Sequence, residues 1–381
     1  MSKKRVFIGM SGGVDSSTAA LLLKKQGYDV TGITIQAVPE GMNKEENLCC
    51  GFDAIYDAKR VCGMLGIPHY VINLRKDFNK HVINDFIREY TSGRTPNPCV
   101  RCNKYIKFDI LLNKIRALGG GYFATGHYAR IKKSGRSHML LKGTDSEKDQ
   151  SYFLYAINKK YFKYILFPLG NINKNEVRKI AKKNGLPMHS KHDSQGICFV
   201  PDKDYKTFIQ SHSSYIRKKG DVIMGGKKIG EHRGIINYTI GQRRGLGIAY
   251  GIPIYVVGID AKSNTVYVAK RGSLRYNKIE IKDTNLLTSK KSISSCRKST
   301  LKIRHICREI PVKKTVCRKD SICVHLKNNI EYVPLGQSAV LYNKDTVLGG
   351  GIIQSASYTE CGDASVIYPE RISKGRKVHR S

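Results

Sequence analysis

The chain has 381 residues, and 67 Lys plus Arg against 30 Asp plus Glu give it a formal net charge of +37. This length exceeds what one hydrophobic core usually organises, so we expect two or three domains, and the 40% apolar fraction is enough to build them. No secretory signal opens the sequence and no apolar run approaches the roughly 18 residues of a membrane span, which excludes secreted and membrane proteins and predicts a cytoplasmic one.

The first half of the chain alternates short β-rich runs with amphipathic helical patterns. This alternation predicts an α/β domain in which crossover helices connect the strands of a parallel sheet. The predicted strands are residues 5–10, 29–36, 69–73 and 122–125. The predicted helices are residues 16–27, 52–65, 77–92, 106–118, 151–157 and 173–184.

The pattern changes twice in the second half. A helix followed by short strands with Gly-rich turns predicts a small mixed domain, and the later alternation of apolar and polar residues predicts an all-β barrel or sandwich. We therefore divide the chain into an α/β domain at 1–202, a central domain at 203–275 and a β domain with a basic tail at 276–381.

A Gly-rich loop connects the first predicted strand to the first predicted helix. Its sequence is SGGVDS, residues 11–16, and a strand, loop and helix in this order direct backbone N–H groups at an anion. The hydroxyls of Ser11, Ser16 and Ser17 are candidate donors to phosphate. The loop lacks the Gly-Lys-Ser/Thr ending of a kinase or GTPase P-loop, and it is not a dinucleotide fingerprint. Asp15 suits such a loop if it holds Mg²⁺ or orients the backbone.

Two segments present cysteines in settings that predict chemistry. Cys99 and Cys102 lie between two prolines and a basic stretch, where we expect a rigid loop, and Cys198 follows a Gly-containing turn. Cations next to these thiols are expected to lower their pKa values and make them reactive. The candidates are Arg101 and Lys104 for Cys102, and Lys191 or His192 for Cys198.

The other cysteines are expected to be ordinary buried residues or redox-silent thiols. Eleven cysteines in a chain without a secretion signal do not predict a disulfide framework. Cys49 and Cys50, although adjacent, are included in this expectation.

Six motifs follow one another along the chain: SGGVDSS (11–17), TPNPCVRCNK (95–104), ATGHYAR (124–130), KDQSYFL (148–154), DSQGICF (193–199) and GQSAV (336–340). The Gly-rich loop by itself resembles the pyrophosphate loop of the N-type ATP pyrophosphatases, which adenylate a carbonyl or carboxyl oxygen. In this order and spacing, the six motifs together resemble those of the tRNA-specific 2-thiouridylases, over residues 5 to about 354.

The resemblance implies a fold and a reaction. The fold is a parallel-sheet PP-loop domain of the adenine nucleotide α-hydrolase type, a small central domain and a C-terminal β-barrel. ATP, with Mg²⁺, adenylates the C2 oxygen of the wobble uridine of a tRNA. Sulfur carried as a persulfide on Cys198 then attacks C2, and Cys102 helps release it and ends in a disulfide with Cys198. A persulfide donor or relay protein must load the enzyme.

The resemblance also assigns residues by position. ATP-binding positions are Gly9, Met10, Ser11, Gly12, Gly13, Val14, Asp15 and Ser16, with Ile35 and Gly126 at the adenosine. Positions that meet the target base are Asn97, Pro98 and Cys99. Positions that contact tRNA are His127, Lys148, Asp149, Gln150, Arg304, His305 and Gln337. The net charge of +37 is consistent with a polyanionic partner, although lysines on solvated faces would also produce it.

Two positions depart from the family pattern. Ile35 stands where many relatives carry Met, and Cys99 stands where many carry Asp. With Cys99, Cys102 and Cys198 the site has three thiols, which is enough to ligate a [4Fe–4S] cluster or, with a histidine, zinc. We rank the persulfide route first, the cluster second and zinc third.

Two other classes of function fit part of the sequence. A synthetase that adenylates a small acid would explain the Gly-rich loop but would leave the cysteines and the positive charge without a role. An RNA-binding protein with a relic loop would explain the charge alone.

Overall fold

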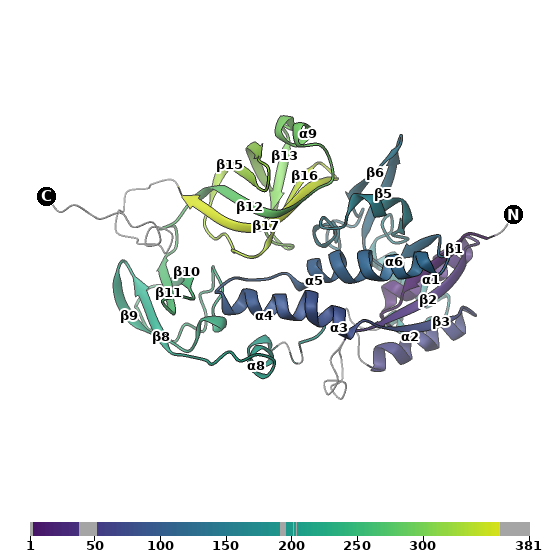
Figure 1. The fold of residues 1–381 in the computed structure, drawn as a ribbon, viewed down its shortest axis with the longest axis horizontal. Helices are drawn as coiled ribbons and strands as arrows, with labels where there is room; N and C mark the ends of the chain where they lie inside the picture. The colour runs from purple at the N-terminus through teal and green to yellow at the C-terminus, as the bar shows by residue number, and fades with distance from the viewer. Residues whose placement is uncertain (1–2, 38–51, 191–195, 201, 203, 359–381) are drawn as a thin grey trace.

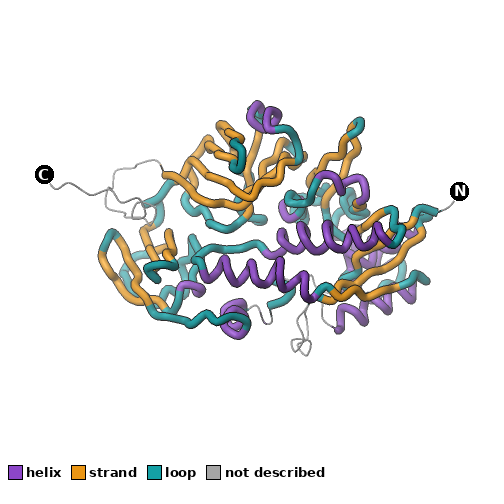
Figure 2. Tube along the Cα trace, viewed as in Figure 1, coloured by secondary structure: helices purple, strands orange, loops and turns teal. Residues whose placement is uncertain are grey.

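The computed structural model describes residues 3–37, 52–190, 196–200, 202 and 204–358. These residues form a parallel sheet with helices, a small four-stranded sheet and a β-barrel (Figure 1). Two long helical segments run along the middle of the molecule, and the barrel lies on one side of them (Figures 1 and 2). The predicted three-part layout is confirmed. The cysteines at 49 and 50 and residues 191–195 lie outside the described residues.

The N-terminal sheet has five parallel strands in the order β3-β2-β1-β4-β7. Val6 on the central strand pairs with Val30 on one side and Tyr122 on the other, and it is fully buried because helices cover both faces of the sheet. The four predicted strands are confirmed, whereas β7 is too short to show a periodicity. The strands are β1 (Arg5–Gly9), β2 (Asp29–Gln36), β3 (His69–Asn73), β4 (Tyr122–Ala124) and β7 (Ile165–Leu166).

The rigid loop predicted around Cys99 and Cys102 is wrong, because a helix begins at Pro98. Proline suits the first helical position, where its missing N–H would have had no partner, and Asn97 caps the helix by accepting from Val100 N at 3.3 Å. Both cysteines therefore lie in the first two turns of one continuous helical segment. The helices of this part are α1 (Val14–Lys25), α2 (Phe52–Met64), α3 (Arg75–Phe78), η1 (Asn79–Ile83), α4 (Asn84–Thr91), α5 (Pro98–Arg101), η2 (Cys102–Leu111), α6 (Leu112–Ala117) and α7 (Lys174–Lys183).

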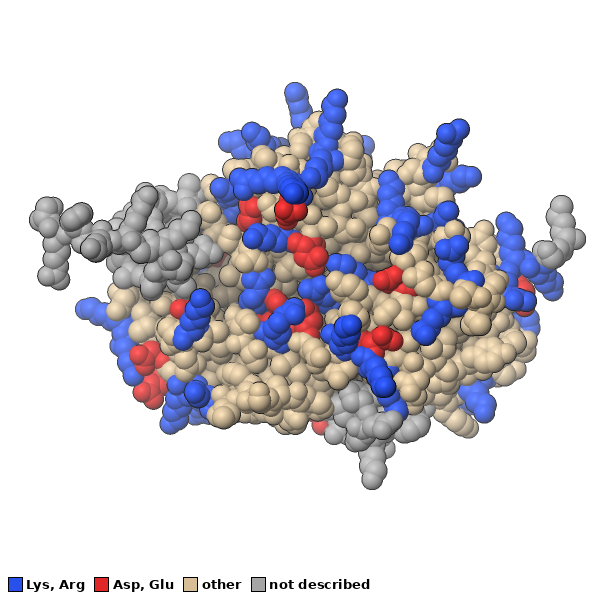
Figure 3. Space-filling model, in the orientation of Figure 1, with Lys and Arg blue, Asp and Glu red and all other residues tan. Residues whose placement is uncertain are grey.

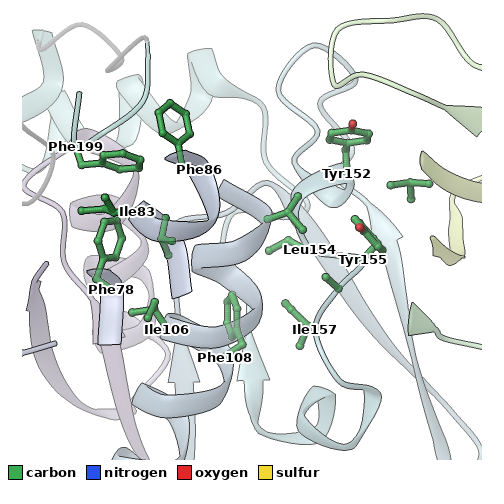
Figure 4. Close-up of a cluster of buried hydrophobic side chains, with 14 of the residues drawn as sticks. Phe78, Ile83, Phe86, Ile106, Phe108, Tyr152, Leu154, Tyr155, Ile157 and Phe199 are labelled. Atoms are coloured by element: carbon green, nitrogen blue, oxygen red, sulfur yellow. The ribbon is translucent and has the colours of Figure 1, made fainter. Parts of the chain in front are cut away.

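An aromatic cluster holds the Cys198 segment against the central helices. The ring of Phe199 meets the rings of Phe78 and Phe86 edge to face, with centroids 5.5 and 5.3 Å apart (Figure 4). Ile106 from the cysteine-bearing helix lies in the same cluster. Edge-to-face pairs of buried rings add about 0.5–1.5 kcal/mol each to the burial of their area. The packing fixes Cys198 next to a helix that is about 100 residues away in sequence.

A hairpin between the α/β part and the barrel was not predicted. β5 (Ala129–Ser134) and β6 (Ser137–Lys142) pair with each other, and Lys142 N donates to Asp345 O of the barrel at 2.9 Å. The charged residues at the tip of the hairpin interrupt the alternation of apolar and polar side chains that would have predicted its two strands. The helix predicted at 151–157 is also wrong beyond a short 3₁₀ turn, η3 (Ser151–Phe153), because Tyr152 donates to Ser338 O in the barrel at 2.8 Å.

The central part is a sheet of order β10-β11-β8-β9, and the C-terminal part is a six-stranded barrel that closes where β12 pairs with β17. The barrel alternative of the sequence prediction is therefore confirmed, while the residues that divide the domains stay a prediction. The elements are α8 (Tyr205–Ser211), β8 (Gly220–Met224), β9 (Lys227–His232), β10 (Ile254–Asp260), β11 (Thr265–Lys270), β12 (Tyr276–Leu286), α9 (Lys290–Ser295), β13 (Ser299–Lys302), β14 (Ile310–Cys317), β15 (Ile322–Ile330), β16 (Ser338–Asn343) and β17 (Thr346–Tyr358). Over the residues described, no helix has the length and apolar character to cross a membrane.

Candidate active site

One cavity brings the Gly-rich loop and the cysteines of two distant segments together. Its volume is about 1490 Å³, counting the part open to solvent. Thirteen of the residues singled out from the sequence line it: Gly9, Met10, Ser11, Asp15, Ser16, Ile35, Pro98, Cys99, Cys102, Gly126, His127, Gln150 and Cys198. Thr34, Asn103, Lys107 and Phe153, which sequence reasoning did not select, line it as well.

The backbone of the Gly-rich loop is arranged to hold an anion. Gly12 has a φ of +68°, and a Cβ there would lie 2.9 Å from Ala54 O, so only glycine fits. Helix α1 starts behind Gly13, which caps it without a side-chain bond, so its first N–H groups remain available to phosphate oxygens.

Of the three serines predicted as phosphate donors, Ser11 and Ser16 line the cavity and Ser17 does not. Ser16 and Ser17 both donate to Gly13 O, at 3.1 and 2.9 Å, and Ser17 is fully buried. Ser17 therefore holds the loop in shape instead of facing a phosphate.

Asp15 accepts hydrogen bonds from two side chains that were not predicted from the sequence as its partners. Lys174, at the start of α7, donates to both carboxylate oxygens at 2.7 and 2.8 Å, and Tyr128 donates to Oδ1 at 2.7 Å. The Lys174 side chain is only 9% exposed. Of the two roles predicted for Asp15, these contacts support orientation of the loop. They also put a buried ammonium group next to the anion site.

The residues of the cysteine-bearing helix that line the cavity recur every three to four positions. Cys99, Cys102, Asn103, Ile106 and Lys107 all line the cavity, which is the spacing of one helical face. The sequence carried this signal, but the expectation of a loop concealed it. Cys99 is exposed, whereas Cys102 is half-buried.

The two cations predicted to activate Cys102 point elsewhere. Arg101 donates to Asp85 at 2.9 Å and to Asp283 at 3.1 Å, and Lys104 donates to Asp283 at 3.2 Å. Burial acts to raise the pKa of the Asp283 carboxyl, but the two cations outweigh it and lower that pKa. Carboxylates compensate both charges, so the effect predicted for these two cations on the pKa of Cys102 stays a prediction. Among the residues that the structure describes, Lys107 also lines the cavity.

His127 lies in the cavity wall as a neutral ring. Burial, helped by the charge of Lys107, holds its pKa well below the ordinary value. Nδ1 lies 2.6 Å from Thr125 Oγ1. A neutral imidazole can hydrogen-bond a base or a ribose but adds no charge against phosphate.

The cysteines do not form a metal site in this arrangement. Within the described ranges, no three side chains of His, Cys, Asp or Glu are grouped closely enough to hold a metal ion. Cys99, Cys102 and Cys198 line the same cavity, but they are not grouped around a position where one metal centre could contact all three. In this arrangement they do not fit a [4Fe–4S] cluster or zinc.

Comparison with known proteins agrees with this architecture. Residues 4–202 match the family described as tRNA methyl transferase HUP domain, residues 206–270 the tRNA methyl transferase PRC-barrel domain and residues 276–353 the aminomethyltransferase beta-barrel domain. The tRNA-specific 2-thiouridylase MnmA of Clostridium perfringens is 43% identical over 93% of this chain and 99% of its own length. The tRNA-specific 2-thiouridylase MnmA 1 of Caldanaerobacter subterraneus subsp. tengcongensis is 44% identical over 92% and 98%. This chain belongs to the tRNA-specific 2-thiouridylase family.

The tRNA-contacting positions assigned by resemblance to the 2-thiouridylases divide into two groups. Asp149 is buried and accepts from Gly143 N and Ser151 N at 3.0 Å each, and Gln337 donates to Pro96 O at 2.8 Å. These two side chains hold the protein together. Whether either one also meets tRNA stays a prediction.

Of the remaining positions, His127 and Gln150 line the cavity, and His305 lies next to it. His305 donates to Asp149 O at 2.9 Å and lies against the ring of Phe153, which lines the cavity, with centroids 4.5 Å apart. Arg304 donates to Ile240 O at 3.0 Å, linking the barrel to the central part. Lys148 is half-buried. Lysines and arginines are spread over all three parts on the face shown in Figure 3.

Gly126 offers a direct test of the nucleotide loop. A Cβ at this position would lie 2.8 Å from the backbone of Asp15 and Ser16, so Gly126→Ala must displace the loop. We expect a rise of about tenfold or more in the KM for ATP, because a misplaced loop loses about 1.4 kcal/mol or more of binding. Gly63→Ala, in a helix where a Cβ meets nothing within 4 Å, is the matched control. Equal KM values for the two variants would contradict the assignment.

Proposed function

We propose that this chain is a tRNA-uridine 2-sulfurtransferase, which makes 2-thiouridine at the wobble position of tRNA and converts ATP to AMP and pyrophosphate. The observation that carries the proposal is that one cavity is lined by both the anion-binding loop and the thiols of Cys102 and Cys198. A small-acid synthetase needs the loop without the thiols, and an RNA-binding protein needs neither.

The first step of the proposed reaction uses the loop. The C2 oxygen of uridine attacks the α-phosphate of ATP, and pyrophosphate leaves toward the N-terminus of α1 and the ammonium group of Lys174. Mg²⁺ would accompany the nucleotide. Among the described residues that line the cavity, Asp15 offers a carboxylate, which its ion pair with Lys174 holds in place to orient the loop. Adenylation changes a poor leaving oxygen into AMP.

The second step uses the thiols. Cys198, loaded with a persulfide by a donor or relay protein, attacks C2 with its outer sulfur, and AMP leaves. Cys102 then attacks Cys198 Sγ, which breaks the sulfur–sulfur bond, releases 2-thiouridine and leaves a Cys102–Cys198 disulfide. No step is assigned to an iron–sulfur cluster, because the three cysteines do not gather in the arrangement described above.

The target base reaches the thiols only after it leaves its stack. Asn97, Pro98 and Cys99 at the start of the helical segment are proposed to receive it, together with His127 and Gln150. All of these residues except Asn97 line the cavity. Asn97 serves as the helix cap and therefore presents a fixed surface. A tRNA substrate and a sulfur relay both belong to the cytoplasm, which is the proposed location.

Pyrophosphate release tests the first step. We expect release only when ATP and a tRNA with a wobble uridine are both present, and no release with a tRNA that carries another base there. Labelled sulfur from a loaded enzyme should appear in that tRNA. Pyrophosphate formed with a small acid in the absence of tRNA would favour a synthetase, and salt-sensitive tRNA binding that ATP leaves unchanged, without turnover, would favour a simple RNA-binding protein.

A further inference from the structure

The proposed sulfur transfer uses two cysteines, yet a third lines the same cavity. Cys99, Cys102 and Cys198 all contribute to its wall. Because the described side chains offer no metal site there, the third thiol is not accounted for by a cluster. The disulfide between Cys102 and Cys198 that ends each proposed cycle must be opened before the enzyme can be loaded again.

Cys99 and Cys102 are one turn apart at the beginning of the helical segment 98–117. Side chains three residues apart share a helical face with Cβ atoms about 5–6 Å from each other, and a disulfide needs about 3.5–4.5 Å. Closing that gap requires movement of the first helical turn, which is held by two long hydrogen bonds: Val100 N donates to the Asn97 side chain at 3.3 Å and Arg101 N donates to Asn97 O at 3.4 Å. Two thiols at this spacing where a helix starts are typical of a redox pair, and a helix N-terminus stabilises thiolate.

The three thiols also differ in how far they reach solvent. Cys99 is exposed, while Cys102 and Cys198 are half-buried. An external reductant therefore meets Cys99 more readily than it meets a disulfide between the two inner thiols. An exposed disulfide is reduced more easily than one that is shielded from solvent.

We propose that Cys99 resets the enzyme by thiol–disulfide exchange, an inference that rests on the function proposed above. The Cys99 thiolate attacks Cys102 Sγ, a Cys99–Cys102 bond forms as the Cys102–Cys198 bond breaks, and Cys198 leaves with the electron pair as a thiolate. The step exchanges one disulfide for another and is redox neutral. Cys198 is then available to accept sulfur, and an external dithiol, itself oxidised to a disulfide, reduces the Cys99–Cys102 bond at the surface.

The anchoring of the helix start suits this role. Gln337 of the barrel donates to Pro96 O at 2.8 Å, and Asp283 binds Arg101 at 3.1 Å. These contacts anchor the residues on both sides of Cys99. The exchange then requires movement only within the first helical turn and the Cys198 segment.

Peptide mapping of the oxidised enzyme tests the proposal. The persulfide-loaded chain is given ATP and tRNA for one turnover without reductant, the remaining thiols are alkylated, and disulfide-linked peptides are identified by mass spectrometry. We expect a Cys99–Cys102 link and an alkylated Cys198. A Cys102–Cys198 link with Cys99 alkylated would overturn the inference.

Two variants complete the test. Cys99→Ser should retain a Cys102–Cys198 disulfide and, with a dithiol present, should make about one 2-thiouridine per enzyme before it slows at least tenfold relative to the unaltered chain. Cys296→Ser, which removes a half-buried cysteine of the barrel, should match the unaltered chain. Sustained turnover by Cys99→Ser would overturn the inference and leave the proposed function intact, whereas no thiolated tRNA from the unaltered chain would reject the function itself.

Discussion

Lys174→Met should lower kcat/KM for tRNA- and ATP-dependent pyrophosphate release by about 10²–10³-fold, the loss typical when one preorganised electrostatic donor is removed. Lys174 binds both oxygens of Asp15 at 2.7 and 2.8 Å, and its ammonium group is nearly buried at the edge of the anion site. Methionine fills a similar volume without charge, so the change removes the ion pair and leaves the packing. Steady-state pyrophosphate kinetics measure the effect.

Folding is the main alternative explanation for such a loss. Lys174→Met leaves the Asp15 carboxylate with the hydrogen bond from the Tyr128 hydroxyl but without its ion pair, which we expect to cost about 1–3 kcal/mol of stability. Adding Asp15→Asn removes the stranded charge, so the double variant should recover stability in a denaturant titration while its activity stays low. Lys179→Met, at an exposed position of the same helix, is the matched control. Recovery of activity together with stability would assign Lys174 a structural role only.

The parallel sheet could be predicted from sequence because its strands carry their own signal. Residues 29–36 and 69–73 are continuous β-rich runs between helical patterns, and both strands have the predicted bounds. The helix at Pro98 was missed because two prolines were interpreted as loop formers, although proline at the first helical position with Asn97 before it is a start signal. The β5–β6 hairpin was missed because the charged residues at its tip interrupt the alternation of apolar and polar side chains.

The candidate site was predicted in part. The loop and the thiols were found because their residue types and spacing carry chemistry locally. Lys174 could not be found in this way, since 159 residues separate it from Asp15 and only the packing of α7 against α1 brings them together. The pairing of Arg101 and Lys104 with Asp283 was missed for the same reason, because that carboxylate comes from the barrel. Contacts between domains leave no periodicity in the sequence.

Cys198→Ser should abolish 2-thiouridine formation while tRNA-dependent pyrophosphate release persists. Serine has nearly the shape of cysteine but cannot carry a persulfide, so adenylation of the base proceeds and sulfur transfer does not. The aromatic packing of Phe199 holds the segment independently of the thiol, so we expect the melting temperature to change little. Nucleoside analysis of the tRNA and a pyrophosphate assay on the same sample separate the two steps.

The contrast with other cysteines makes this result specific to the proposed chemistry. Cys317→Ser alters a half-buried thiol on β14 that does not line the cavity. This variant should form 2-thiouridine and release pyrophosphate at the level of the unaltered chain. If Cys198→Ser still produced 2-thiouridine, sulfur would have to reach C2 from another carrier, and the persulfide route would be wrong. If the Cys198→Ser variant lost pyrophosphate release as well, Cys198 would be needed to position the base. Adenylation does not use the thiol itself, so it would then depend on Cys198 only through the placement of the uridine.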